Sequence, residues 1–155
     1  MRKLTTILSV CLIFSLTLLF SCKKDDDNTT PGSTGKTVKL TFTVNGVNAE
    51  SDYVSFVAVG GASDRTTNTV WKVNGVTRSN EQGISLGKND FTGTTKTYVI
   101  ESVVPLDLVK VGIQCINFDA PYVLSYTAEV DGKVVTSNQN VSVETNKDYT
   151  HDFTY

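Results

Sequence analysis

His151 is the only histidine in the chain and therefore the only imidazole that could act as a general base. It lies in Tyr149-Thr150-His151-Asp152, which alternates as a strand does, so His151 and Asp152 point to opposite faces and cannot form an orienting pair. A serine and an acid could still approach His151 from elsewhere, because geometry rather than sequence order defines a catalytic triad. No Gly-x-Ser-x-Gly motif supports this. The sequence favours a non-catalytic protein, with a hydrolase using His151 as the alternative.

Potential metal ligands are dispersed. Apart from the run Asp25-Asp26-Asp27, the aspartates stand singly, and the chain contains no EF-hand loop or repeated Asp-x-Asp motif. Gly60-Gly61 joins two strand-like segments instead of opening a helix, so it does not form a phosphate loop. We expect no metal and no cofactor. The alternative is a calcium ion held where loop acids converge at one end of the fold, with Asp64, Asp90 and Asp119 as candidates.

Aromatic residues near turns are the best candidates for ligand contacts, because sugar sites use exposed rings edged by Asn, Asp and Gln and because loops often carry binding. The candidates nearest turns or chain ends are Tyr53, Phe91, Tyr122 and Tyr155. Three others lie within alternating segments and are expected to face the core: Trp71, Tyr98 and Tyr126. The polar loops 61–68 and 79–93 are where binding is most expected.

From Thr37 onward the chain alternates with a period of two, which predicts strands with one solvated face. The clearest example has apolar residues at Val38, Leu40, Phe42 and Val44. Three dipeptides predict hairpin turns: Asn45-Gly46, Asn74-Gly75 and Asp131-Gly132. No segment longer than two helical turns has an apolar stripe. The prediction is all-β, a single immunoglobulin-like β-sandwich of about 7–9 antiparallel strands over residues 37–155, with a small β-barrel as the alternative.

The segment Val70-Trp71-Lys72-Val73-Asn74-Gly75 resembles the third-strand signature of immunoglobulin-like domains of the PKD type. In that family a tryptophan on this strand fills the core between the sheets. Trp71 shares a face with Val73, as that role requires. The resemblance covers six residues and implies a fold without implying a function.

The first 21 residues are predicted to be an export signal. Arg2 and Lys3 precede an uncharged stretch over residues 4–20, which is short for a membrane-spanning helix and well sized for a secretory signal. Leu19-Phe20-Ser21-Cys22 resembles a bacterial lipobox, which implies a lipoprotein signal peptide over 1–21 and lipidation of Cys22. An ordinary signal peptide or an uncleaved anchor is the alternative.

Charged residues follow the lipobox directly: Lys23, Lys24, Asp25, Asp26 and Asp27. With Cys22 they resemble the surface-export signal of lipoproteins of the Bacteroidota. This implies attachment to the outer membrane through the lipid on Cys22 and display at the cell surface, the periplasmic face being the alternative. Residues 22–36 are then a flexible tether, because 28–36 are polar and rich in Pro, Gly, Ser and Thr.

The formal net charge is −2, which gives no basic footprint for nucleic acid. Cys115, in a strand-like segment, is expected to be a buried small hydrophobe. We therefore expect a non-catalytic cell-envelope lipoprotein, an extracellular binding or structural module whose partner is a glycan, an envelope protein or a host surface. An accessory subunit of an outer-membrane complex is a further alternative.

Overall fold

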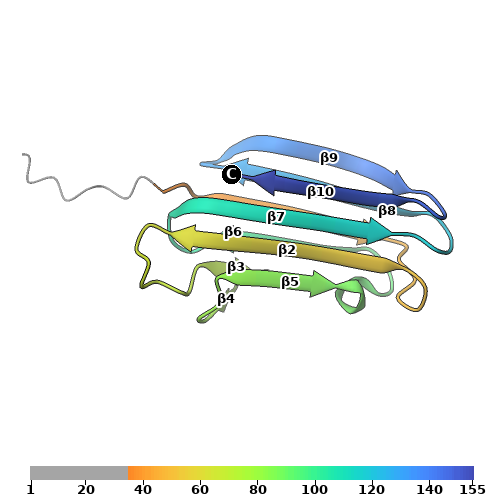
Figure 1. The fold of residues 1–155 in the computed structure, drawn as a ribbon, viewed down its shortest axis with the longest axis horizontal. Coiled ribbons are helices and arrows are strands. Elements are labelled where there is room, and N and C mark those ends of the chain that lie inside the picture. Colours follow the sequence, from red (N-terminus) through yellow and green to blue (C-terminus); the bar gives the residue numbers. More distant parts are fainter. Residues whose placement is uncertain (1–34) are drawn as a thin grey trace, which may run out of the picture. The chain divides into compact units, whose positions relative to one another are not determined.

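Residues 35–155, the part of the chain that the computed structural model describes, form two antiparallel β-sheets packed face to face (Figure 1). The six-stranded sheet contains, in spatial order, β4 (Val76–Arg78), β3 (Trp71–Val73), β6 (Lys96–Ser102), β1 (Val38–Asn45), β8 (Tyr122–Val130) and β9 (Lys133–Val143). The four-stranded sheet contains β10 (Asp148–Thr154), β7 (Leu106–Ile116), β2 (Tyr53–Ala62) and β5 (Gly83–Gly87). A 3-10 helix, η1 (Lys88–Phe91), follows β5.

The prediction of an all-β sandwich is confirmed, and the sheets do not close into the alternative barrel. Two of the predicted turns join neighbouring antiparallel strands. Asn74-Gly75 connects β3 to β4, and Asp131-Gly132 connects β8 to β9, with positive φ at all four residues. The hairpin predicted at Asn45-Gly46 is wrong. β1 pairs only with β6 and β8, whereas β2 belongs to the other sheet, so this turn begins a crossing between sheets.

The core lies between the two sheets and is built on aromatic contacts. The rings of Phe42 and Phe56, one from each sheet, are stacked with centroids 4.9 Å apart. Trp71 is fully buried, as its family resemblance implies, and its indole Nε1 donates a hydrogen bond to the Gln82 carbonyl at 2.9 Å. A Cβ at Gly60 would lie 2.7 Å from the indole, so this close approach requires glycine.

Cys115 and Tyr126 are fully buried, which confirms the predictions for both residues. Burial raises the pKa of the Cys115 thiol from its ordinary value of 9.0 to about 12. Tyr98 is only partly buried, although it packs against the core as expected. Because its pKa is raised, the Cys115 thiol is neutral at physiological pH and acts as a packing residue.

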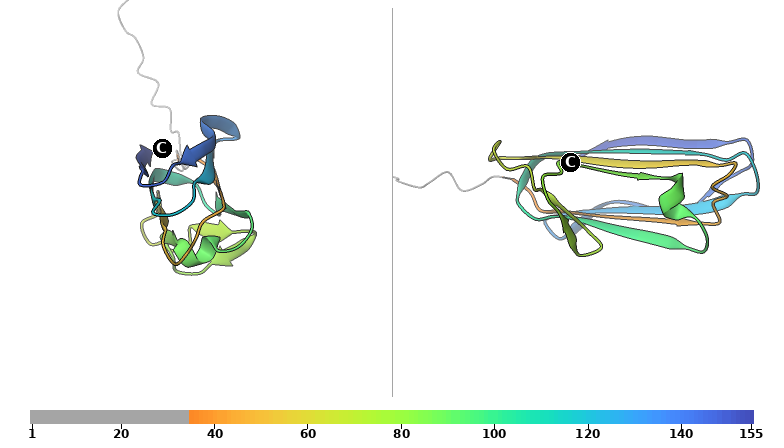
Figure 2. Two further views of the ribbon diagram at one scale, coloured as in Figure 1. Left: turned by 90° about the vertical axis from the view of Figure 1, so that its right-hand side faces the viewer. Right: turned by 90° about the horizontal axis from the view of Figure 1, so that it is seen from below.

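The domain has two distinct ends, visible in Figures 1 and 2. We call the end where Lys36 enters the domain the near end, and the opposite end the far end. At the near end Lys36 forms an isolated bridge with Leu106, with N–O distances of 2.8 and 2.9 Å. Lys36, expected to be the last tether residue, is thus hydrogen-bonded to the domain. The far end carries η1 and the connections 46–52, 117–121 and 144–147.

The predicted signal peptide over 1–21, the lipidation site Cys22 and the export-like segment 23–27 lie outside the described residues. Of residues 35–155, no helix has the length and apolar character needed to cross a membrane.

Candidate functional site

The outer face of the four-stranded sheet, here called the four-stranded face, carries side chains arranged in rows across adjacent strands. Ser55, Gln114 and Thr150 form one row across β2, β7 and β10. The next row contains Val57, Gly112 and Asp152. Their neighbours along β2 and β7 are buried on the core side, so alternation directs both rows to solvent.

One hollow on this face, the far hollow, has a volume of about 500 Å³ and lies between β2, β5 and η1. It opens where β5 ends: Gly87 pairs with Ser55, and the chain then turns into η1, which leaves the start of β2 without a neighbour on that side. Asp90 Oδ2 accepts a hydrogen bond from the Gly87 amide at 2.8 Å and stabilises this turn. The lining residues are Ser51, Asp52, Tyr53, Val54, Ser55, Ser85, Gly87, Lys88, Asn89 and Asp90.

Asp52 fixes the wall of the far hollow. Its side chain is buried, and its two carboxylate oxygens accept hydrogen bonds from the amides of Asn48 at 2.9 Å and Phe118 at 3.0 Å. These contacts tie two far-end loops to the start of β2, where Tyr53 is 43% exposed. The Ser51 Oγ beside it is buried and has no hydrogen-bond partner within residues 35–155. Tyr53 is therefore an exposed ring on a well-anchored backbone.

A second hollow, the central hollow, has a volume of about 260 Å³ and lies over Gly112. Gly112 contributes no side chain to the middle of the sheet, and Asp152 Oδ1 lies 3.3 Å from the position that a Cβ would take there. Ser55 lines both hollows, which therefore adjoin at this residue. The lining residues are Ser55, Val57, Gly112, Ile113, Gln114, Thr150 and Asp152.

Polar side chains in these hollows are mostly unpaired. Within residues 35–155, the side chains of Ser55, Ser85, Gln114 and Asp152 form no hydrogen bond or ion pair with other protein groups. Thr150 donates only a long bond of 3.3 Å to Asp148 Oδ2. These donors and acceptors are available to a ligand that displaces water from the face.

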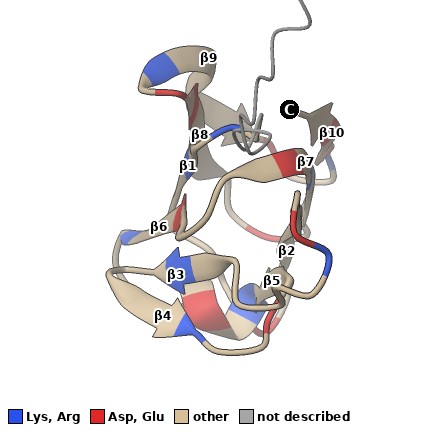
Figure 3. Cartoon of the chain, turned by 90° about the vertical axis from the view of Figure 1, so that its left-hand side faces the viewer, with Lys and Arg blue, Asp and Glu red and all other residues tan. Residues whose placement is uncertain are grey.

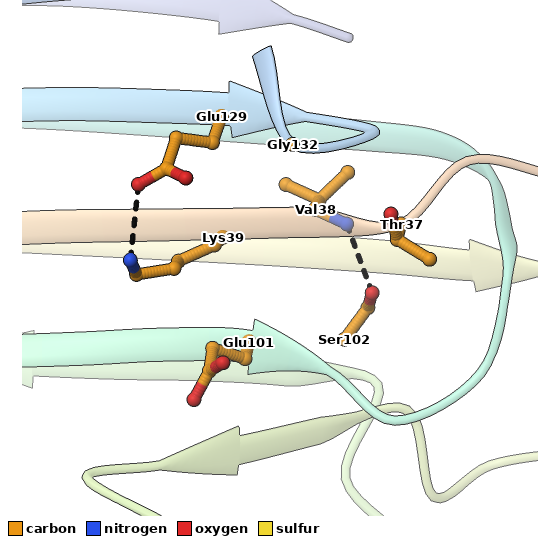
Figure 4. A pocket seen from close by; sticks show the side chains of 7 residues that line it. All are labelled: Thr37, Val38, Lys39, Glu101, Ser102, Glu129 and Gly132. Carbon is orange, nitrogen blue, oxygen red and sulfur yellow. Dashed lines mark hydrogen bonds and ion pairs between the residues drawn. The ribbon is translucent and has the colours of Figure 1, made fainter. Parts of the chain in front are cut away.

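The outer face of the six-stranded sheet differs. Lys39 Nζ lies 3.0 Å from Glu129 Oε1, and Ser102 Oγ accepts the Val38 amide at 2.9 Å, in a hollow of about 200 Å³ shown in Figure 4. The neighbouring Glu101 pairs with Lys72 at 3.3 Å. Further along the same face Thr43 and Thr97 share a hydrogen bond of 2.9 Å. This face uses its polar groups to join strands.

Charge on the domain is mixed. Viewed from the near end, basic and acidic segments are interspersed over both sheets (Figure 3). Asp64 follows β2 at the near end, whereas Asp90 lies in η1 at the far end, so the three loop acids considered for calcium do not converge. Residues 35–155 contain no group of three or more His, Cys, Asp or Glu side chains placed to hold a metal ion.

Of the predicted contact residues, Tyr53 lines the far hollow, but two others are wrong as ligand contacts. Phe91 and Tyr122 are each only 1% exposed. Phe91 ends η1 and packs edge-on against Phe42, with centroids 5.3 Å apart. Tyr122 begins β8 on its core side, and its hydroxyl donates to the Tyr53 carbonyl at 3.3 Å. Proximity to a turn did not indicate which face each ring occupies.

Tyr155 is half-buried and lies away from both hollows. Its hydroxyl donates to Thr136 Oγ1 at 2.9 Å and lies 3.2 Å from the Tyr126 hydroxyl, which links β10 to the six-stranded sheet. His151 is exposed on the same side of β10, with its ring centroid 4.4 Å from that of Tyr149. Its ring also stacks on that of Phe153, with centroids 6.0 Å apart, and within residues 35–155 no serine or acid forms a hydrogen bond to it.

Sequence reasoning missed Ser55, Gln114 and Gly112. A glycine inside the strand-like segment 109–115 is a signal for an uncovered sheet or a close backbone approach, and it could have directed attention to Gly112. Phe118, which is 59% exposed at the far end, was also missed. The row partners of Gly112 could not be found in the same way, because they come from strands distant in sequence.

No protein-family model matches this chain, and no curated protein matches it. Solved structures with a similar fold include two proteins of low sequence identity. The calcium-bound form of a protein from Parabacteroides distasonis is 15% identical, with a TM-score of 0.60 over 83% of this chain and 98% of that one. A DUF4425 family protein from Bacteroides ovatus is 10% identical, with a TM-score of 0.54 over 79% of this chain and 95% of that one. The chain is thus a β-sandwich similar in structure to proteins of the Bacteroidetes.

Proposed function

We propose that this chain is a lipoprotein anchored in the outer membrane through Cys22, displayed at the cell surface, whose domain binds an external ligand without catalysing a reaction. The binding surface is the four-stranded face. The observation that carries this proposal is the pair of adjoining hollows, in which the side chains of Ser55, Gln114 and Asp152 have no protein partner within residues 35–155. The proposed location at the cell surface is supported by the resemblance of residues 19–27 to a lipobox followed by a surface-export signal.

The placement of the hollows is compatible with an anchored domain. Lys36 is bound beside Leu106 at the near end, and Tyr53 begins β2 at the far end. β2 has ten residues, so its ends are separated by roughly 30 Å at about 3.3 Å per residue. The point where the chain joins the domain therefore leaves the far hollow open to a ligand that approaches from outside the cell.

The anchor is tested by replacing Cys22 with Ala and following radioactive fatty-acid labelling and membrane fractionation. Cys115→Ala is the matched control, since it removes the one cysteine of the described domain. We expect labelling in the unsubstituted protein and in the control, and none in Cys22→Ala. Replacing Asp25, Asp26 and Asp27 with Ala should then lower protease accessibility on intact cells. Persistent labelling of Cys22→Ala would contradict the lipoprotein assignment.

A further inference from the structure

We infer that the ligand of the four-stranded face is an uncharged glycan chain, laid across β2, β7 and β10 with one sugar ring against Tyr53. This inference rests on the binding function proposed above and names the class of ligand. It follows from the shape of the hollows, from the chemistry of their unpaired side chains and from their charge.

The shape fits a chain rather than a small compact molecule. The two hollows meet at Ser55, so a ligand can pass from the far hollow to the central hollow without leaving the surface. The row Ser55, Gln114 and Thr150 crosses three adjacent strands, a span of about 10 Å at the usual spacing between strands. Gly112 provides a floor on which an extended ligand can lie close to the sheet.

The unpaired groups match sugar hydroxyls, each of which both donates and accepts. The Gln114 amide and the hydroxyls of Ser55 and Thr150 also have both capacities, and the Asp152 carboxylate accepts strong bonds from O–H donors. The exposed ring of Tyr53 offers an apolar surface with a polar tip to the carbon face of a sugar.

The charge favours an uncharged glycan over an acidic one. Three carboxyl groups line the hollows, those of Asp52, Asp90 and Asp152, against the single ammonium of Lys88. A uronate or sulfated chain would bring further negative charge against Asp152 in the central hollow, where no lining residue is basic. Polyanionic glycans should therefore bind weakly.

The test is an array of neutral and acidic host and microbial glycans, together with outer-membrane and host-surface proteins, probed with the full mature protein in a sugar-free detergent. Gly112→Thr fills the central hollow, and the only close neighbour of its new Cβ is the flexible end of Asp152. Gly61→Thr is the matched control, because Gly61 lies on the same face of β2 with open space around its Cβ position. Melting temperatures verify that both variants fold.

We expect at least one uncharged glycan to bind, with affinity reduced about tenfold or more in Gly112→Thr and little changed in Gly61→Thr. Equal loss in both variants, or preference for acidic glycans, would overturn the inference. If no glycan binds but a protein ligand is lost in Gly112→Thr alone, the glycan class is wrong and the proposed binding face stands. If no ligand of any class is sensitive to Gly112→Thr, both proposals fail.

Discussion

The two outer faces of this sandwich belong to different sheets whose strands alternate in the same way, but the two faces use their polar residues differently. On the six-stranded sheet Lys39 pairs with Glu129, Lys72 pairs with Glu101, and Thr43 bonds to Thr97. On the four-stranded face the side chains of Ser55, Gln114 and Asp152 have no protein partner within residues 35–155 and border two hollows. Composition alone does not separate a face that stabilises the fold from a face that can bind.

The difference arises from register. Lys39 lies opposite Glu101 on one side and Glu129 on the other, so a cation is flanked by two acids across neighbouring strands. Ser55 lies opposite Gln114, two groups with no charge to pair, and Gly112 in the next row contributes no side chain. A single glycine and an uncharged row thus leave part of the sheet uncovered.

The largest predicted effect is the loss of stability at alkaline pH. This effect tests whether the two sheets unfold together in one cooperative transition. Burial raises the pKa of Cys115, behind the four-stranded face, and those of Tyr122 and Tyr126, behind the six-stranded sheet. The unfolded chain loses these protons first, so the free energy of unfolding is unaffected by them below pH 9 and falls as pH rises. For Cys115 the loss extends from pH 9.0 to about 12. Above the pKa that it has in the unfolded chain, each group lowers the free energy of unfolding by up to about 1.4 kcal/mol per pH unit.

Denaturant titrations at several alkaline pH values provide the measurement, with Trp71 fluorescence reporting on the six-stranded sheet and amide exchange of β7 on the other. Both probes should give the same midpoint at each pH. In Cys115→Ala, the free energy of unfolding should begin to fall only near pH 10.0, where the tyrosines of the unfolded chain ionise. A separate, earlier transition in β7 would show that the four-stranded face is a loosely held sheet.

A smaller effect is predicted for the polar residues themselves. A double-mutant cycle of Lys39→Ala and Glu129→Ala should give a coupling free energy of about 0.5 kcal/mol, reduced by salt, because both side chains are partly exposed. Asp152→Asn, which breaks no pairing, should change stability by less than about 0.5 kcal/mol. A large loss on Asp152→Asn would mean that the four-stranded face also serves the fold, and the contrast between the faces would fail.

The sequence predicted those structural features that depend on the residue pattern of one strand alone. The alternation of β1, the burial of Cys115 and the core position of Trp71 follow from local pattern, because burial of alternate side chains is a property of one strand. It did not predict which strands are neighbours. Asn45-Gly46 has strong hairpin chemistry, yet it leads to the other sheet.

The candidate site was predictable only in part for the same reason. Tyr53 was identified from its position near a turn, but equal proximity placed Phe91 and Tyr122 in the core. The row Ser55, Gln114 and Thr150 is assembled from three strands far apart in the chain. Only tertiary pairing brings those side chains together, so no local pattern contains the site.

The most direct test of the binding face is an amide chemical-shift titration of the isotopically labelled protein with the uncharged glycan that binds best on the array. Shifts should concentrate on Ser55, Gln114 and Thr150. The matched positions Thr41 and Thr127, which pair on the outer face of the six-stranded sheet, should not move. Shifts concentrated on Thr41 and Thr127, with Ser55, Gln114 and Thr150 unchanged, would contradict the assignment of the four-stranded face as the binding surface.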